Sequence, residues 1–227
     1  MKTARKLALG IGGWLQFEFA CDRSGLFSEK YLASAVGNLL RADFGAQVHA
    51  EVNHPILAPL MRGAGRRPQI DFAIQNPYPN ISVAVETKWH GSTPARLEDI
   101  IWDLIRLEML VSAYGTDAFF ILAGRKKDLD ALFRRTAWLA PYRHRPGARP
   151  LLKTDQRRAQ QLNLSSPPPI RASIIKKAVS RINGIPVPAT IPTTNPEAYP
   201  VPSYNYQYMV YVWRVLSSVN RIVFNPH

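Results

Sequence analysis

One carboxylate and one ammonium group interrupt an otherwise apolar stretch, residues 83–89. Glu86 and Lys88 lie two residues apart. Because side chains alternate between the two faces of a β-strand, both would point to the same face. The preceding apolar stretch, residues 69–74, carries Asp71, and antiparallel pairing of the two stretches would bring Asp71 beside Glu86. Burying such charges is costly unless each has a partner, so this pattern predicts a functional site.

Two converging carboxylates repel each other, and a divalent cation between them removes that repulsion. Asp71 and Glu86 supply hard oxygen ligands, which suit Mg²⁺ or Mn²⁺, with water and a phosphate oxygen completing the coordination. Lys88 cannot bind the same ion as an ammonium. It can orient an attacking water, help to lower its pKa, or neutralise charge that develops on phosphorus.

Asp71 and the Glu86-x-Lys88 motif resemble the PD-(D/E)xK nuclease superfamily, which has the restriction-endonuclease-like fold. The resemblance covers roughly residues 28–124. It implies that Asp71 and Glu86 are metal ligands together with the Thr87 backbone carbonyl, and that Lys88 is the catalytic lysine. Members of the superfamily often add a Glu from the leading helix, and Glu29 is the positional match.

The proline that usually precedes the Asp of this motif is absent, since Ile70 occupies that position. That position is the loosest part of the motif. The resemblance implies an α/β fold with a restriction-endonuclease-like mixed central sheet flanked by helices. It also implies a Mg-dependent phosphodiesterase of the endonuclease type, and it favours DNA over RNA. A homodimer is an option, because many superfamily members cut two strands as dimers.

Hydrophobic periodicity and turn residues predict the elements that position these groups. Ser28 is a candidate helix cap, Ser92 or Thr93 caps the helix between the buried strands, and Gly115 ends it. A helix between two buried strands predicts a crossover and a partly parallel sheet. The expected order is strand 13–20, helix 28–43, strand 47–53, strands 69–74 and 81–88, helix 93–114, strand 118–122 and a helix near 129–133.

The whole surplus of positive over negative charge lies after Gly124. The net charge is +13; residues 1–124 contain 12 Lys+Arg and 12 Asp+Glu, whereas residues 125–158 contain 11 and 3. Prolines also concentrate beyond residue 140. We therefore divide the chain into a nuclease core with an N-terminal strand, 1–140, and a basic, Pro-rich and aromatic extension, 141–227. The extension is expected to contain a helix and a terminal hairpin around residues 217–220, and to pack on the core or bind nucleic acid.

The basic residues favour a polyanionic partner, because Lys and Arg that contact phosphates release counterions. Nucleic acid ranks ahead of an anionic membrane; DNA is preferred and RNA is a second choice. Solvated side chains are the alternative for each residue, and Trp138, Tyr142 and His144 could stack on unpaired bases. Arg66 and Arg67 are candidate phosphate contacts near the cleavage site, and the further candidate nucleic-acid contacts are Arg125, Lys126, Lys127, Arg134 and Arg135.

Simpler interpretations compete with the catalytic one. Glu86 and Lys88 could form a surface pair on an edge strand, Asp71 could be solvent-exposed, and Glu29 could serve only the helix dipole. His90 is expected to be a polar group at a strand end, and Asp103 and Arg106 a structural pair three residues apart. Competing functions are a non-catalytic nucleic-acid-binding or assembly module with the same fold, and a metal-dependent RNase or toxin-like effector.

Composition excludes several other classes. An apolar content of 46% excludes a wholly disordered chain, and no run of about 18 apolar residues predicts a membrane span. One cysteine, Cys21, cannot form an internal disulfide, and the N-terminal apolar run lacks a signal-peptide cleavage pattern. These features favour a cytoplasmic protein.

Overall fold

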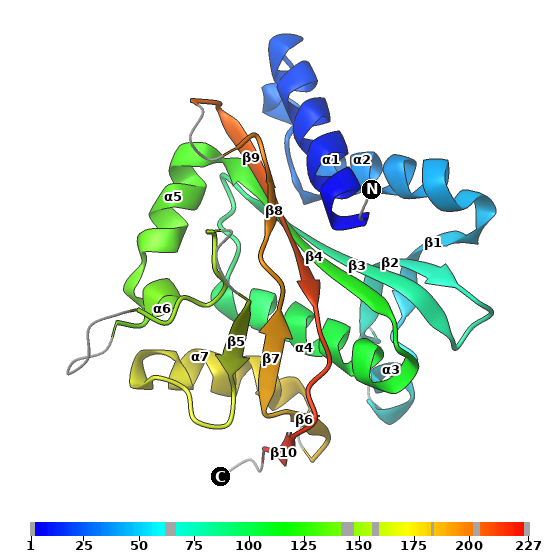
Figure 1. Ribbon diagram of the computed structural model, residues 1–227, viewed down its shortest axis with the longest axis vertical. Helices are drawn as coiled ribbons and strands as arrows, with labels where there is room; N and C mark the ends of the chain where they lie inside the picture. The colour runs from blue at the N-terminus through cyan, green and yellow to red at the C-terminus, as the bar shows by residue number, and fades with distance from the viewer. Residues whose placement is uncertain are drawn as a thin grey trace.

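A computed structural model describes residues 3–61, 67–141, 148–155, 159–182, 184–201 and 205–224. The described chain is a mixed α/β protein with seven α-helices and an eight-stranded mixed sheet (Figure 1). The helices are α1 Thr3–Ala20, α2 Glu29–Phe44, α3 Leu57–Leu60, α4 Leu97–Tyr114, α5 Lys126–Arg134, α6 Thr136–Leu139 and α7 Pro169–Val179. The strands are β1 Val48–Asn53, β2 Gln69–Gln75, β3 Ile81–His90, β4 Asp117–Arg125, β5 Gln160–Asn163, β6 Pro186–Pro188, β7 Thr190–Thr193, β8 Glu197–Tyr199, β9 Tyr208–Val215 and β10 Arg221–Val223.

The main sheet has the order β1-β2-β3-β4-β9-β7-β5, and β8 also pairs with β9. β2 and β3 are antiparallel, whereas β3 and β4 are parallel with α4 between them in sequence. The predicted crossover between parallel strands is therefore confirmed. β3 lies between two partners, so Glu86 and Lys88 do not lie on an edge strand.

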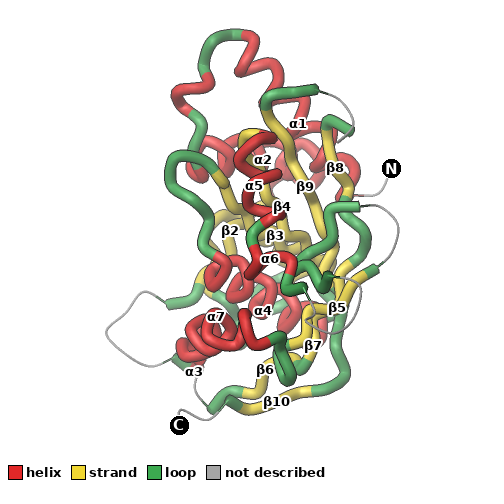
Figure 2. Tube along the Cα trace, turned by 90° about the vertical axis from the view of Figure 1, so that its left-hand side faces the viewer, coloured by secondary structure: helices red, strands yellow, loops and turns green. Residues whose placement is uncertain are grey.

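Two hydrophobic clusters lie on opposite faces of this sheet, and helices cover both faces (Figures 1 and 2). Helices α1 and α2 pack on one face, where Val83 and Val85 belong to the same buried cluster. Helix α4 packs on the other face over Ala84 and Phe120, with α7 beyond it. Because Glu86 and Lys88 alternate with Val85, their side chains point toward α4.

The prediction of a strand at 13–20 is wrong, because these residues belong to α1. The alternation around Trp14 is only local. Leu7, Ile11 and Leu15 recur at helical spacing and are buried against the sheet, and this longer period decides the structure. Gly12 allows close packing, since a Cβ there would lie 2.3 Å from Tyr199 Cδ1.

Helix boundaries follow the predicted signals unevenly. Ser28 caps α2 by accepting a hydrogen bond from the Tyr31 backbone N–H, and Gly115 ends α4 in the left-handed conformation. The predicted cap of α4 at Ser92 or Thr93 is wrong, because α4 begins at Leu97 and its N-cap residue makes no side-chain cap. The residues between β3 and α4 instead include Ala95, whose backbone N–H donates to His90 Nδ1.

The prediction of a terminal hairpin around residues 217–220 is also wrong. β9 lies beside β4 along its full length, and β10 pairs with β6 in a separate two-stranded sheet. The fully buried Glu108 on α4 anchors the chain between β9 and β10: it accepts from the Ser218 backbone N–H and pairs with Arg221. The described residues of segment 141–227 thus share the sheet and the core of the preceding residues. None of the described helices is both long and apolar enough to cross a bilayer.

We expect His54 to make the stability of the fold pH-dependent. Its Nδ1 accepts from the Leu57 backbone N–H, and its Nε2 contacts the Arg106 carbonyl oxygen, within a site that has no solvent exposure. Burial lowers the pKa of His54 to about 4. The unfolded chain therefore takes up a proton that the native state excludes as the pH falls below about 6.5.

His54 contributes its full stabilisation of the native state at pH values above its pKa in the unfolded chain. This contribution is lost as the pH falls toward its native pKa of about 4. This linkage amounts to roughly 3 kcal/mol at most. Urea unfolding between about pH 6.5 and pH 4 should show that the free energy of unfolding falls more steeply with decreasing pH for wild type than for His54→Asn. Equal pH slopes for the two proteins would contradict the assignment.

Candidate functional site

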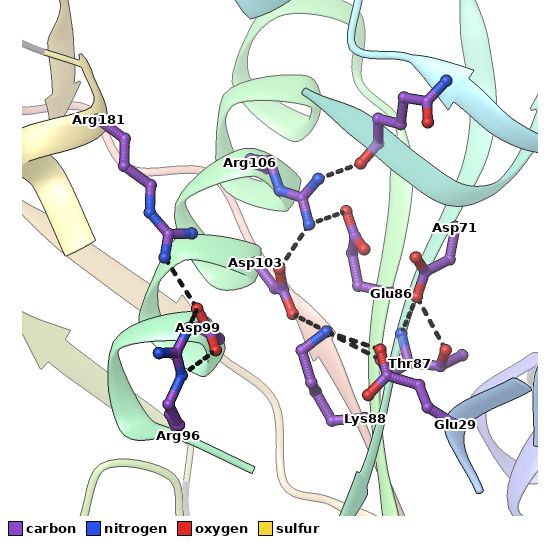
Figure 3. Close-up of polar contacts among 11 residues, drawn as sticks. Glu29, Asp71, Glu86, Thr87, Lys88, Arg96, Asp99, Asp103, Arg106 and Arg181 are labelled. Carbon is purple, nitrogen blue, oxygen red and sulfur yellow. Dashed lines mark hydrogen bonds and ion pairs between the residues drawn. The ribbon is translucent and has the colours of Figure 1, made fainter. Parts of the chain in front are cut away.

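Asp71 lies where β2 and β3 separate. The last paired residues on this side are Phe72 and Val85, so Asp71 and Glu86 are the next opposed positions on the α4-facing side. Asp71 Oδ2 accepts hydrogen bonds from the Thr87 backbone N–H at 2.7 Å and from Thr87 Oγ1 at 2.8 Å. The Asp71 carboxylate thus accepts the hydrogen bond that the Thr87 backbone N–H would otherwise donate to a neighbouring strand, and this contact holds it beside Glu86 (Figure 3). This confirms the convergence of Asp71 and Glu86 that the sequence predicts.

Glu86 is fully buried, and neither of its carboxylate oxygens has a hydrogen-bond partner among the described residues. Its compensation is ionic: Arg106 Nη2 lies 3.0 Å from Oε1. Burial raises the pKa of Glu86 well above its usual range; Asp71 and Asp103 raise it further, and Arg106 and Lys88 oppose them. A buried carboxyl group whose oxygens accept no hydrogen bond is stabilised when a cation lies close to it.

Lys88 reaches three oxygen atoms. Its Nζ lies 3.0 Å from Asp103 Oδ2, 3.2 Å from Glu29 Oε1 and 3.3 Å from the Thr87 carbonyl oxygen. Burial alone lowers the pKa of Lys88, but the carboxylates of Asp103 and Glu29 outweigh it, and the net pKa is raised. Lys88 is therefore an ammonium at neutral pH. Its side chain is 15% exposed, which leaves it accessible to a ligand.

Asp103 and Arg106 belong to the same cluster. They form the predicted ion pair within α4, but Asp103 also holds Lys88, and Arg106 also pairs with Glu86 (Figure 3). Arg106 further donates to the Gln69 carbonyl oxygen on β2. The sequence signal for this role is that apolar residues flank both on either side along α4, where a buried charged pair needs partners across the interface.

The cluster has an excess of negative groups. Four carboxyl side chains, those of Glu29, Asp71, Glu86 and Asp103, face two cationic ones, those of Lys88 and Arg106. With every group ionised, the difference of two charges equals that of one divalent cation. Burial is the main cause of the raised pKa of Glu86, and repulsion from the Asp71 and Asp103 carboxylates adds to it.

These residues fit a Mg²⁺ ion that is bound by few protein ligands. Within the described ranges no group of three or more His, Cys, Asp or Glu side chains is arranged around one point. Asp71, Glu86 and the Thr87 carbonyl form the candidate set, and Mg²⁺ commonly uses one or two carboxylates plus water and substrate phosphate. Glu29 contacts Lys88; its predicted role as a metal ligand stays a prediction.

Most of the predicted nucleic-acid contacts that the structure describes lie on the surface. Arg67, Arg125, Lys127, Arg134 and Arg135 are exposed. Lys126 pairs with Asp130 at 2.9 Å. Arg66, Tyr142 and His144 lie outside the described residues. The prediction that Trp138 stacks on unpaired bases is wrong, because its side chain is buried in the core against Phe133.

Comparisons with known proteins give no relative. Scans against protein-family models, curated proteins and solved structures find no match to this chain. The geometry of the cluster therefore carries the functional argument.

We expect Asp103→Asn to destabilise the protein by about 3 kcal/mol, because Lys88 and Arg106 would lose the carboxylate that they share in a buried site. Denaturant unfolding at neutral pH measures this loss. The matched control is Asp99→Asn on the same helix. Asp99 pairs with the more exposed Arg96 and Arg181, so its loss should be within about 1 kcal/mol. Similar losses for the two variants would contradict the buried-cluster account.

Proposed function

We propose that the protein is a metal-dependent nuclease of the PD-(D/E)xK type, with a restriction-endonuclease-like core, that hydrolyses phosphodiester bonds in DNA. The observation that carries the proposal is the pair of carboxyl groups, Asp71 and Glu86, beside an ammonium, Lys88. Glu86 is buried without a hydrogen bond. A purely structural cluster gains nothing from an excess of two negative charges, whereas a cation-binding site requires them.

Asp71, Glu86 and the Thr87 carbonyl would hold Mg²⁺, with Mn²⁺ as a substitute. The ion supplies Lewis-acid activation of water and stabilisation of charge on the phosphate oxygens. In an in-line displacement, a bond forms from the water oxygen to phosphorus as the bond to the leaving oxygen breaks; the attacking water gives up a proton to solvent, and the leaving oxygen takes one up from solvent. Because its pKa is raised, Lys88 acts as a fixed positive charge rather than as a base; it stabilises the developing phosphorane charge and orients the nucleophile.

Asp103, Arg106 and Glu29 position these groups. Asp103 and Glu29 hold Lys88 Nζ from two sides, at 3.0 and 3.2 Å, which reduces the number of rotamers that the long side chain can adopt. Arg106 compensates Glu86 from the side of α4. These contacts supply the preorganisation on which electrostatic catalysis depends.

A nucleic-acid-binding or assembly module is the second candidate. The observation that favours it is the ionic pairing itself: Arg106 already meets Glu86, and Asp103 already meets Lys88. A chain that only binds nucleic acid could use such pairs to join α4 to the sheet. A metal-dependent RNase or toxin-like effector uses the same site chemistry as the nuclease, and differs only in substrate.

Mg²⁺-dependent cleavage tests the proposal. Wild type should cut DNA with Mg²⁺ or Mn²⁺ and lose activity in EDTA. Lys88→Met and Glu86→Gln should each lower the cleavage rate by about 10²- to 10⁴-fold, because they remove charge that acts on the transition state or holds the metal. Circular plasmid, single-stranded DNA and RNA of matched sequence separate the substrate classes.

Asp99→Asn is the control for cleavage, since Asp99 lies on α4 outside the cluster and should retain wild-type activity. Circular dichroism of every variant guards against loss of the fold. If cleavage survives Lys88→Met or Glu86→Gln, the site assignment is wrong. If wild type binds nucleic acid and cuts none of the substrates, the binding module is the correct interpretation.

A further inference from the structure

A pocket of about 370 Å³ opens at the outer edge of the main sheet. β5 is the last strand in the sheet order and, among the described strands, pairs only with β7 (Figure 1). Gln160 and Gln161 both line the pocket. Because consecutive side chains point to opposite faces of a strand, the pocket extends around the outer edge of β5. Passing from β3 through β4, β9 and β7 to β5 takes four strand spacings, roughly 20 Å, so the pocket is separate from the carboxylate cluster.

The lining of this pocket is basic. It includes Arg149, Lys153 and Arg171, and the described lining contains no Asp or Glu. Arg149 is exposed and Lys153 is partly exposed, so both side chains are accessible to a ligand. None of the lining residues is aromatic. A pocket with three cations and no acidic group favours an anion, and without aromatic rings it offers no surface on which bases could stack.

Arg171 shapes the pocket and adds positive charge, but it is not a ligand contact. Its side chain is only 2% exposed, and its guanidinium donates to the carbonyl oxygens of Ala137, Trp138 and Arg149. These three acceptors are neutral, so they leave the positive charge of Arg171 acting across the pocket wall. Pro168, the N-cap residue of α7, also lines the pocket, and the first turn of α7 contains no acidic residue. The positive end of the helix dipole therefore adds to the same potential.

The amide side chains add hydrogen-bonding groups to this charge. Gln160 Nε2 donates to the carbonyl oxygens of Pro150 and Leu151, which holds the side chain against the wall of the pocket. Asn163 Oδ1 accepts from the Ser166 backbone N–H at 2.8 Å, which leaves its Nδ2 group as a donor. Phosphate oxygens accept hydrogen bonds from such groups, and the edge of a sheet commonly forms an anion-binding concavity.

The carboxylate cluster makes a separate phosphate contact necessary for the proposed nuclease. Its four carboxyl groups and two cations leave an excess of negative charge, which repels a phosphate backbone until a metal ion is bound. The free energy of binding a polyanion must therefore come from positive surfaces elsewhere. The pocket lies in the part of the chain after Gly124, which holds the whole positive surplus.

We infer that this pocket binds a backbone phosphate of the nucleic acid and anchors the substrate away from the cutting site, irrespective of base sequence. Arg149 and Lys153 contact the phosphate, and Asn163 donates to one of its oxygens. This inference rests on the proposed function for the identity of the polyanion. Because a remote contact is the same in the ground state and in the transition state, it lowers KM and leaves kcat unchanged.

Binding can be measured apart from cleavage, by fluorescence anisotropy in EDTA. The probe is a labelled DNA duplex of about 20 base pairs, which at about 3.4 Å per base pair is long enough to reach both sites. Ala159→Glu places a carboxylate in the pocket, because Ala159 is exposed and belongs to the lining. Ala46→Glu is the matched control, since Ala46 is an exposed alanine just before β1, at the opposite edge of the sheet.

At about 0.15 M salt, where exposed charges act over about 8 Å, Ala159→Glu should weaken binding about tenfold and Ala46→Glu less than about twofold. Lys153→Gln should reduce the salt-dependence slope by about 0.9, to the same extent for duplexes of different sequence. Lys177→Gln, which changes an exposed lysine on α7 outside the lining, should leave the slope unchanged. In Mg²⁺, Lys153→Gln should raise KM about fivefold with little change in kcat.

Equal losses for Ala159→Glu and Ala46→Glu, or an unchanged salt slope in Lys153→Gln, would overturn the inference, because binding would then depend on overall charge. Absence of duplex binding by wild type in EDTA would overturn it too, while Mg²⁺-dependent cleavage would still decide the proposed function. If Ala159→Glu weakens binding but wild type never cuts with Mg²⁺, the pocket stands and the nuclease does not. Cleavage that depends on Lys88 but has the same KM in Ala159→Glu removes the pocket alone.

Discussion

The burial of charge between β3 and α4 is the constraint on which the rest of the structure depends. Glu86 is withdrawn from water, and its only close cation in the described chain is Arg106 on α4. Asp103 then holds both Arg106 and Lys88. α4 cannot rotate or slide on the sheet without separating buried charges, which is strongly unfavourable. The ion cluster therefore fixes the register of the helix that covers this face.

The surrounding fold serves this arrangement. β2 and β3 separate at Asp71, which allows its carboxylate to bind the Thr87 backbone and to stand opposite Glu86. α2 begins next to Lys88 because Ser28 caps it there. The chain between β9 and β10 is in turn tied to α4 through Glu108. The result is a rigid frame around a carboxylate pair that has an excess of negative charge, as a cation site needs.

The sequence predicted which charged residues the two strands bring together better than it predicted their surroundings. Period-two alternation in β3 and a paired β2 were enough to bring Asp71, Glu86 and Lys88 together. The partners on α4 were not predictable, because most residues of α4 are buried, charged ones included, and its pattern does not indicate which of them face the sheet. The placement of β9 beside β4 depends on pairing across about 90 residues of chain, which local patterns do not encode. The helical period in α1 extends beyond the short window in which Trp14 alternates.

Diffraction from crystals grown with Mn²⁺ tests the central claim most directly. We predict an anomalous difference peak between the Asp71 and Glu86 carboxylates, next to the Thr87 carbonyl oxygen, with Lys88 still held by Asp103. The absence of a peak, with Arg106 remaining the only cation on Glu86, would show that the cluster is a structural ion network and would contradict the metal-dependent account.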